Sequence, residues 1–175
     1  MLKVERVVTG FLDENCYIVH NGNECLVIDP GSDINKIVTN INRLLLVVKG
    51  VLITHYHSDH VGCLDYMKDV YKVPVIDYKN AGDVVIDSFN FKVIETFGHT
   101  MDSCSFYFDK DSMLFSGDFI FKGTIGNIED ECEEEMFKSL KSLKFYPEKV
   151  IIYPGHEEQT TVGEELKNNP YFRGI

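Results

Sequence analysis

The alternation of hydrophobic and polar positions in the first third of the chain predicts a β-meander followed by a helix. Apolar runs of β-like composition cover residues 3–8, 16–20 and 25–28, and Asn21-Gly22-Asn23 supplies a hairpin turn. Asp29-Pro30-Gly31 then ends the third run. Beyond it, Ser32 or Asp33 is placed to cap a helix. The apolar positions of that helix follow the spacing of one helical face: Ile34, Ile37, Val38 and Ile41.

The rest of the chain repeats this alternation of short strands and helices. Residues 47–54 predict a buried strand that ends abruptly in a histidine-rich stretch. Shorter strands are predicted over 73–76, 83–86, 91–97, 104–108, 113–115 and 150–153, with a turn near 87–90 and the strand at Pro74 near a sheet edge. Helices are predicted over 64–71, 131–144 and 163–168.

Two hairpin-rich segments, each followed by helices, predict an α/β (α+β) architecture of mixed sheets packed together with helices outside. The length of 175 residues predicts one domain, residues 1–175. No repeat, low-complexity tract or linker divides the chain.

Composition narrows the classes of function. Hydrophobic residues make up 44% of the chain and charged residues 26%, which is ordinary globular usage. The formal net charge of −11 disfavours nucleic acid as a partner, because phosphate binding needs clustered Lys and Arg. No apolar run reaches the roughly 18–20 residues of a membrane span, so we expect no membrane association. Five widely spaced cysteines without a C-x-x-C pair predict neither disulfides nor a zinc ribbon, and a cytoplasmic location fits best.

The chemistry is concentrated at the ends of the predicted strands. His55-Tyr56-His57-Ser58-Asp59-His60 follows the strand over 47–54 and supplies four metal-ligand side chains within six residues. We expect this stretch to be a tight loop. Gly98-His99-Thr100, Ser116-Gly117-Asp118 and Pro154-Gly155-His156 each place one further ligand-type residue after a β-like run, and only His20 is left over.

Each fragment also has an ordinary structural interpretation. A single Gly-His or Gly-Asp pair after a strand is more often a turn than a ligand. Clustered imidazoles without a metal, however, repel one another when protonated and lose hydration when buried. The four fragments taken together therefore predict a metal centre. The Glu129 to Glu135 charge run is interpreted as the solvated start of a helix.

These motifs resemble those of the metallo-β-lactamase superfamily, and in detail the short glyoxalase II-like (hydroxyacylglutathione hydrolase-like) hydrolases. The early Asn15-Cys16-Tyr17-Ile18-Val19 and the tail Asn169-Pro170-Tyr171-Phe172 are also similar to those proteins, so the resemblance covers nearly the whole chain. It implies a four-layer αββα sandwich with the site at one edge of the two sheets.

The resemblance also implies a ligand set. His55, His57 and His99 would hold one metal ion, and Asp59, His60 and His156 a second. Asp118 would bridge both. Such nitrogen and oxygen donors suit zinc, with iron or manganese as alternatives.

The implied reaction is hydrolysis by a metal-bound hydroxide that attacks a carbonyl carbon, with Asp59 and Asp118 as catalytic residues. Side chains placed to support the imidazoles or to contact a substrate are weaker candidates. Supporting hydroxyls are Thr54, Thr100 and Ser103, and substrate contacts are Tyr56, Phe119 and Lys122.

Three departures from the wider superfamily limit the function. No cysteine occupies the second site, and Cys63 and Cys104 are interpreted as buried structural thiols, so antibiotic hydrolysis is not the leading hypothesis. We expect no counterpart of the additional helical domain that contributes to glutathione binding in full-length glyoxalase II, so recognition of a glutathione thioester is not implied. The stretch Gly126-Asn127-Ile128-Glu129-Asp130 lacks the arginine that related proteins carry there.

The leading hypothesis is a metal-dependent hydrolase of a small thioester or ester. An iron-dependent persulfide dioxygenase and a non-catalytic metal-stabilised domain are the alternatives. The sequence predicts a small-molecule substrate without naming it, and fixes neither the metal nor the oligomeric state.

Overall fold

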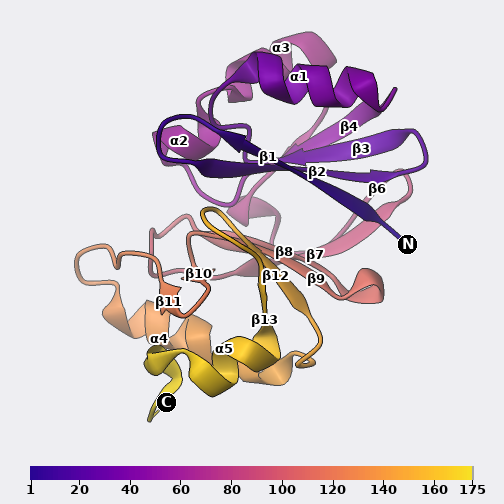
Figure 1. The fold of residues 1–175 in the computed structure, drawn as a ribbon. Helices are drawn as coiled ribbons and strands as arrows, with labels where there is room; N and C mark the ends of the chain where they lie inside the picture. Colours follow the sequence, from indigo (N-terminus) through magenta and orange to yellow (C-terminus); the bar gives the residue numbers. More distant parts are fainter. Residues whose placement is uncertain (175) are drawn as a thin grey trace.

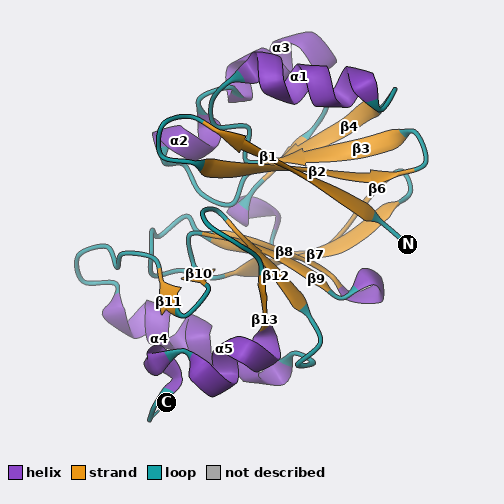
Figure 2. Cartoon of the chain, viewed as in Figure 1, coloured by secondary structure: helices purple, strands orange, loops and turns teal. Residues whose placement is uncertain are grey.

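The chain folds into four layers, with two β-sheets packed face to face and helices on both outer faces (Figure 1; Figure 2). The structure is a computed structural model that describes residues 1–174. Helices α1 (Ile34–Arg43) and α3 (Leu64–Tyr71) cover the first sheet, and α4 (Glu133–Ser142) and α5 (Val162–Asn168) cover the second. The predicted αββα sandwich is therefore confirmed, whereas the single-domain expectation stays a prediction.

The first sheet has the order β1-β2-β3-β4-β5. Its strands are β1 (Lys3–Thr9), β2 (Glu14–Asn21), β3 (Glu24–Ile28), β4 (Val47–Leu52) and β5 (Val75–Ile76). β1, β2 and β3 are antiparallel, while β3, β4 and β5 are parallel. The β2–β3 hairpin turns at Gly22, whose φ of +62° suits glycine, and β5 forms the edge, as Pro74 predicts.

The second sheet has the order β13-β12-β9-β8-β7-β6. Its strands are β6 (Gly82–Ile86), β7 (Phe89–Glu95), β8 (Cys104–Phe108), β9 (Met113–Gly117), β12 (Ile151–Pro154) and β13 (Thr160–Thr161). β9 and β12 are parallel and the other neighbours antiparallel. Because β7 and β9 are both antiparallel to β8, strands β7, β9 and β12 run in the same direction.

Several local elements differ from the sequence predictions. The β6–β7 turn is shorter than expected, because Ile86 pairs directly with Phe89 across Asp87 and Ser88. Asp33 precedes α1 without capping it, since its carboxylate accepts from the Gly10 amide and pairs with Lys36. The elements that the sequence did not predict are α2 (Ser58–Val61), the β10 (Ile120–Phe121)–β11 (Thr124–Ile125) hairpin, β13, and the 3₁₀ helices η1 (Tyr78–Asn80), η2 (Asp109–Asp111), η3 (Leu143–Phe145) and η4 (Pro170–Phe172).

The core between the sheets is aromatic and aliphatic. Phe106 and Phe115 of the second sheet lie in one cluster with Leu26 and Leu52 of the first, and all four are fully buried. Phe115 also stacks on Tyr153 with ring centroids 4.8 Å apart. This close packing gives the strand ends a rigid base.

All five cysteines are free thiols, in line with the expected absence of disulfides. Cys104 is buried, but Cys63 is half-exposed, so its interpretation as a buried thiol is wrong. Within residues 1–174, no helix has the length and apolar character to cross a membrane.

Candidate metal centre

The predicted ligand residues meet where parallel strands of both sheets end. β4 leads into the histidine-rich segment, β7 precedes His99, β9 leads to Asp118, and β12 leads to His156. A hydrogen bond from the Asn15 amide to the Gly155 carbonyl, 2.7 Å, joins the two sheets here, and one from the Gly155 amide to the Gly117 carbonyl, 2.9 Å, joins the ends of β12 and β9. The fold therefore brings side chains from positions 55 to 156 to one edge.

The histidine-rich segment is a loop followed by one helical turn, which corrects the expected loop. His57 precedes α2 in extended conformation, and Asp59 and His60 lie within this helix. Because the backbone changes from extended to helical after His57, the side chains of Asp59 and His60 point in a different direction from those of His55 and His57. The change of backbone conformation after His57 thus separates two groups of ligands.

The first group consists of three imidazoles. His57 Nδ1 lies 3.1 Å from His55 Nε2 and 3.0 Å from His99 Nε2. Around a tetrahedral metal with bonds of about 2.0–2.1 Å, ligand atoms lie about 3.3 Å apart. The three nitrogens therefore fit one metal ion.

The second group combines a carboxylate with two imidazoles. Asp59 Oδ2 lies 3.5 Å from His60 Nε2 and 3.3 Å from His156 Nε2. These three ligand atoms all lie within 4.8 Å of one another. Their separations fit a second metal ion equally well.

Asp118 lies between the two groups. Its Oδ1 is 3.3 Å from His60 Nε2, and its Oδ2 is 3.7 Å from His99 Nε2 and 3.5 Å from His156 Nε2. Among residues 1–174, Asp118 Oδ1, His60 Nε2 and His20 Nε2 are the buried side-chain polar atoms without a hydrogen-bond partner. A buried polar atom without a partner is costly, and two of these three point into the centre of the ligand set. The residues present therefore fit a pair of metal ions.

The Nδ1 atoms of three histidines, which point away from the ligand set, are held by hydrogen bonds. His99 Nδ1 donates to the Asn127 carbonyl over 2.7 Å, and His156 Nδ1 donates to the Leu12 carbonyl over 3.1 Å. His60 Nδ1 donates to Asp29 Oδ2, 3.0 Å away. With Nδ1 protonated, each of these rings keeps the lone pair of Nε2 for a metal.

Asp29 is a supporting residue whose role the sequence motif Asp29-Pro30-Gly31 did not predict. Its carboxylate accepts from the Thr54 amide (2.8 Å), the Thr54 hydroxyl (2.7 Å) and His60. Because the Thr54 hydroxyl donates its one proton to Asp29, it accepts from His55 Nδ1, 3.1 Å away. Asp29 is 3% exposed and thus holds one histidine of each ligand group from a buried position. The Asp29-Pro30-Gly31 motif directly after a predicted strand was the available signal.

The other two hydroxyls proposed as supports do not contact an imidazole. Thr100 and Ser103 are 2.7 Å apart, and the Thr100 hydroxyl also lies 2.6 Å from Asp102 Oδ1. They stabilise the turn after His99 instead. Their predicted role is therefore wrong, while that of Thr54 is confirmed.

Glycine next to His156 permits the close approach of Asp118. A Cβ built on Gly155 would collide with Asp118 Oδ1 and approach His60 Cε1. Any larger residue at this position would displace the carboxylate that lies between the two groups.

Burial and neighbouring charges set the protonation states. Burial, together with the nearby His60, lowers the pKa of His55 to about 2, and burial also lowers the pKa of His99. Burial opposes protonation of His60, but Asp118 and Asp29 outweigh it and raise its pKa to about 10. Burial favours protonation of Asp118, but His60 outweighs it and lowers the pKa of Asp118 to about 2. His55 and His99 are thus neutral imidazoles, and the carboxylate of Asp118 is ionised.

The three candidate substrate contacts have different positions. Tyr56 lies on the surface next to His57, and its hydroxyl donates to Asp77 Oδ2 over 2.6 Å. Phe119 is 1% exposed and packs with Met136 and Leu140 in the core, so its predicted place in the pocket wall is wrong. Lys122 is exposed in the β10–β11 turn, where its ammonium lies 3.5 Å from Glu158.

Two cavities adjoin the ligand set. One, of about 380 Å³, lies beside His57 and is lined by Tyr56, His57, Tyr78, Thr100, Met101, Asp102 and Glu129. The other, of about 530 Å³, lies beside His156 and is lined by Arg6, Val8, Leu12, Asp13, Asn15, His156, Glu157 and Glu158. The first adjoins a residue of the first ligand group, and the other adjoins a residue of the second.

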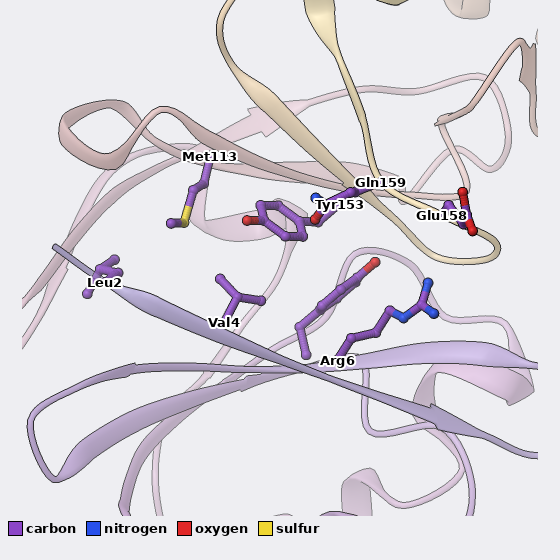
Figure 3. Close-up of a pocket in the computed structure, with 8 residues that line it drawn as sticks. Leu2, Val4, Arg6, Met113, Tyr153, Glu158 and Gln159 are labelled. Atoms are coloured by element: carbon purple, nitrogen blue, oxygen red, sulfur yellow. The ribbon is translucent and has the colours of Figure 1, made fainter.

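A further groove of about 630 Å³ lies between β1 and the segment from β12 to Gln159 (Figure 3). Leu2, just before β1, and Val4 of β1 face Met113 and Tyr153 across it. None of the seven ligand-type residues lines this groove, so it is separate from the metal centre.

Comparison with known proteins agrees with this geometry. The sequence model of the metallo-beta-lactamase superfamily matches residues 9–89 and 74–156. The probable metallo-hydrolase YqgX of Bacillus subtilis is 26% identical, and the alignment covers 99% of both chains. The hydroxyacylglutathione hydrolase GloC of Haemophilus influenzae is also 26% identical, over 98% of both chains.

Solved structures show the same fold. The BLEG-1 B3 metallo-beta-lactamase superposes with a TM-score of 0.92 at 28% identity, covering 99% of this chain and 100% of that one. A di-iron-bound form of TTHA1623 superposes with a TM-score of 0.87 at 27% identity, covering 96% and 100%. On the sequence match, the fold and the convergent histidines and aspartates, the chain belongs to the metallo-beta-lactamase superfamily.

Proposed function

We propose that this protein hydrolyses a small thioester or ester with the help of two divalent metal ions. The observation that carries the proposal is the convergence of seven nitrogen- and oxygen-bearing side chains, with Asp118 between two groups that each fit one ion. Bound there, the ions would lower the pKa of a water molecule towards neutrality and polarise a carbonyl oxygen. Hydrolysis of a thioester adds water across the acyl–sulfur bond and releases a carboxylic acid and a thiol.

Each ligand atom has an assigned position in this proposal. His55 Nε2, His57 Nδ1 and His99 Nε2 would hold the first ion. Asp59 Oδ2, His60 Nε2 and His156 Nε2 would hold the second, and the Asp118 carboxylate would contact both. Neutral imidazoles and carboxylates suit zinc, with iron and manganese as alternatives.

The protein's own groups hold the ligands and the water in place. Asp29 keeps the proton of His60 on Nδ1, because a carboxylate only accepts a hydrogen bond. Asp59 is part-exposed at the edge of the centre, where its second oxygen can orient a water molecule. Asp118, buried and ionised, fixes the distance between the two groups.

The second ligand group favours hydrolysis over persulfide oxidation. A mononuclear iron oxygenase needs two histidines and a carboxylate with open positions, which His55, His57 or His99 and Asp118 could supply. Such an oxygenase does not require the second ligand group, Asp59, His60 and His156. Their geometry supports a binuclear hydrolase in place of the oxygenase.

The first test is the metal content of protein purified without added metal, followed by assays on a panel of thioesters and esters that includes S-lactoylglutathione. We expect two ions per chain and release of thiol. His57→Ala should lower the rate by at least about a hundredfold, because it removes a ligand of the first group.

Other outcomes would contradict the proposal. One iron per chain with oxygen uptake on a persulfide would indicate the oxygenase. A chelator that lowers the melting temperature of a protein inactive on the whole panel would indicate a metal-stabilised domain.

A further inference from the structure

The cavity beside His57 has carboxylates and aromatic rings in its walls. Asp102 and Glu129 contribute the carboxylates, and Tyr56 and Tyr78 the rings. No Lys or Arg side chain lines this cavity. A substrate whose carbonyl carbon reaches the ligand set can extend one arm into this space, because His57 belongs to both.

Neither carboxylate is neutralised by a basic side chain. Asp102 lies 2.6 Å from the Thr100 hydroxyl, and Glu129 accepts from the Met101 amide over 3.2 Å. In the part of the chain that is described, residues 1–174, neither forms an ion pair. The cavity therefore keeps a negative potential, which disfavours an anionic substrate arm and favours a cationic one.

The aromatic residues are placed to strengthen this preference. Tyr56 is fixed by its 2.6 Å hydrogen bond to Asp77, and the ammonium of Lys79 already lies 5.4 Å from the centroid of the Tyr78 ring. A cation over the face of a tyrosine ring is attracted by the ring quadrupole. Carboxylates combined with aromatic faces suit an alkylammonium group.

Two further features bear on how a substrate would lie between the ligand set and this cavity. His60 Nε2 is fully buried, has no hydrogen-bond partner and points into the ligand set that His57 shares. On the opposite flank, Arg6 donates to the Glu157 carbonyl over 2.8 Å, and Lys122 pairs with Glu158. These two basic groups are thus engaged with Glu157 and Glu158, whereas Lys79 lies beside the Tyr78 ring.

We propose that the substrate is a thioester or ester with an alkylammonium group on one arm, and that Asp102 and Glu129 select it. This inference rests on the proposed hydrolase function. It names the charge class of the substrate, and it predicts poor use of thioesters whose arm in this cavity carries a carboxylate.

The test uses three thioesters that differ only in the charge of the leaving arm. Acetylthiocholine is cationic, S-(3,3-dimethylbutyl) thioacetate is its neutral isostere, and S-acetyl-3-mercaptopropionate is anionic. A second series moves the same difference to the acyl arm, as S-ethyl thioesters of 4-(trimethylammonio)butanoate, 5,5-dimethylhexanoate and glutarate. Thiol release gives kcat/KM for each compound.

The decisive quantity is the ratio of kcat/KM for the cationic and neutral compounds, compared between the wild type and the Asp102→Asn/Glu129→Gln variant. Intrinsic reactivity cancels in this comparison. We expect the wild-type ratio to be about five to ten times larger in at least one series. Asp69→Asn/Glu148→Gln removes two exposed carboxylates elsewhere and should leave the ratio unchanged.

A ratio that is unchanged by the Asp102→Asn/Glu129→Gln variant in both series would overturn the proposal. So would anionic compounds that are used as well as cationic ones.

A binding experiment separates this inference from the proposed reaction. Choline is titrated into protein labelled with ¹³C at the methionine methyl groups, and the Met101 signal reports on the cavity. We expect choline to shift that signal in the wild type, with a much smaller shift in the double variant or with 3,3-dimethylbutanol. Inactivity on every thioester together with this shift would reject the hydrolase and keep the cation site. Thiol release without any choline shift or charge preference would do the opposite.

Discussion

The metal centre has two walls of opposite character. The inner wall, made of Asp29, Thr54, His55 and His60, is at most 3% exposed and linked by hydrogen bonds of 2.7–3.1 Å. The outer wall, made of Tyr56, His57, Met101, Asp102 and Glu129, is open to solvent and surrounds a cavity. One segment of three residues, His55 to His57, supplies parts of both.

The difference separates two tasks. Buried side chains held by hydrogen bonds keep the ligand atoms in place, which a reaction centre needs. Exposed side chains with free carboxylates can meet a substrate without disturbing that geometry. Changes in the inner wall should therefore affect metal binding and stability, and changes in the outer wall should affect substrate preference.

The largest effect is expected from Gly155→Ala, which places a methyl group against Asp118 Oδ1. Because the displaced carboxylate lies between the two ligand groups, we expect the rate to fall by about a hundredfold. Metal analysis should show less than two ions per chain.

Gly22→Ala is the control, since no atom lies within 4 Å of a Cβ at that position. It should cost about 1 kcal/mol of stability because of its positive φ, with metal content retained. Equal metal content in both variants would remove Asp118 from the ligand set.

A smaller effect is expected from Asp29→Asn. The amide cannot accept from the Thr54 amide, the Thr54 hydroxyl and His60 as a carboxylate does. We expect the free energy of unfolding to fall by about 2–3 kcal/mol and the metal affinity to fall by about 10- to 100-fold. Urea denaturation and competition with a chelator measure the two quantities.

Asp33→Asn is a matched control, because Asp33 is exposed and lies four residues away. It should leave the metal affinity unchanged. The free energy of unfolding should fall by no more than about 0.5–1 kcal/mol. If Asp29→Asn behaves like Asp33→Asn, the inner wall does not hold the ligands.

The smallest effect is expected from Tyr56→Phe in the outer wall. It removes the hydroxyl that donates to Asp77, and we expect a loss of about 1 kcal/mol of stability. KM for cationic thioesters should rise a few-fold while the metal content stays the same. A lower metal content in Tyr56→Phe would mean that the two walls are not independent.

Much of the fold and the ligand set could be predicted from the sequence because both depend on local patterns. The apolar runs and the Asn-Gly turn predict the first sheet, and the close spacing of His55, His57, Asp59 and His60 indicates a metal site by itself. His99, Asp118 and His156 could be added because each follows a strand that ends at the same edge.

The supporting contacts could not be predicted, since they depend on how distant segments pair. Asp29 reaches Thr54 only because β3 and β4 lie parallel and in register, with Ile28 opposite Leu52. Phe119 follows Asp118 directly, but the turn after β9 sends the two side chains to opposite sides of the sheet. Adjacency to Asp118 therefore identified the correct turn for Phe119, but it did not predict that the Phe119 side chain packs in the core.

Hydrogen bonds between the β1–β2 hairpin and the β12–β13 hairpin determine when the metal centre can form. Leu12 accepts from His156, and Asn15 donates to Pro154 and Glu157, so partners about 140 positions apart must meet. A growing chain carries the histidine-rich segment long before it has residue 156 to complete the second group. Such long-range contacts form late in folding, so binding of an ion by the second group would report that both sheets have docked.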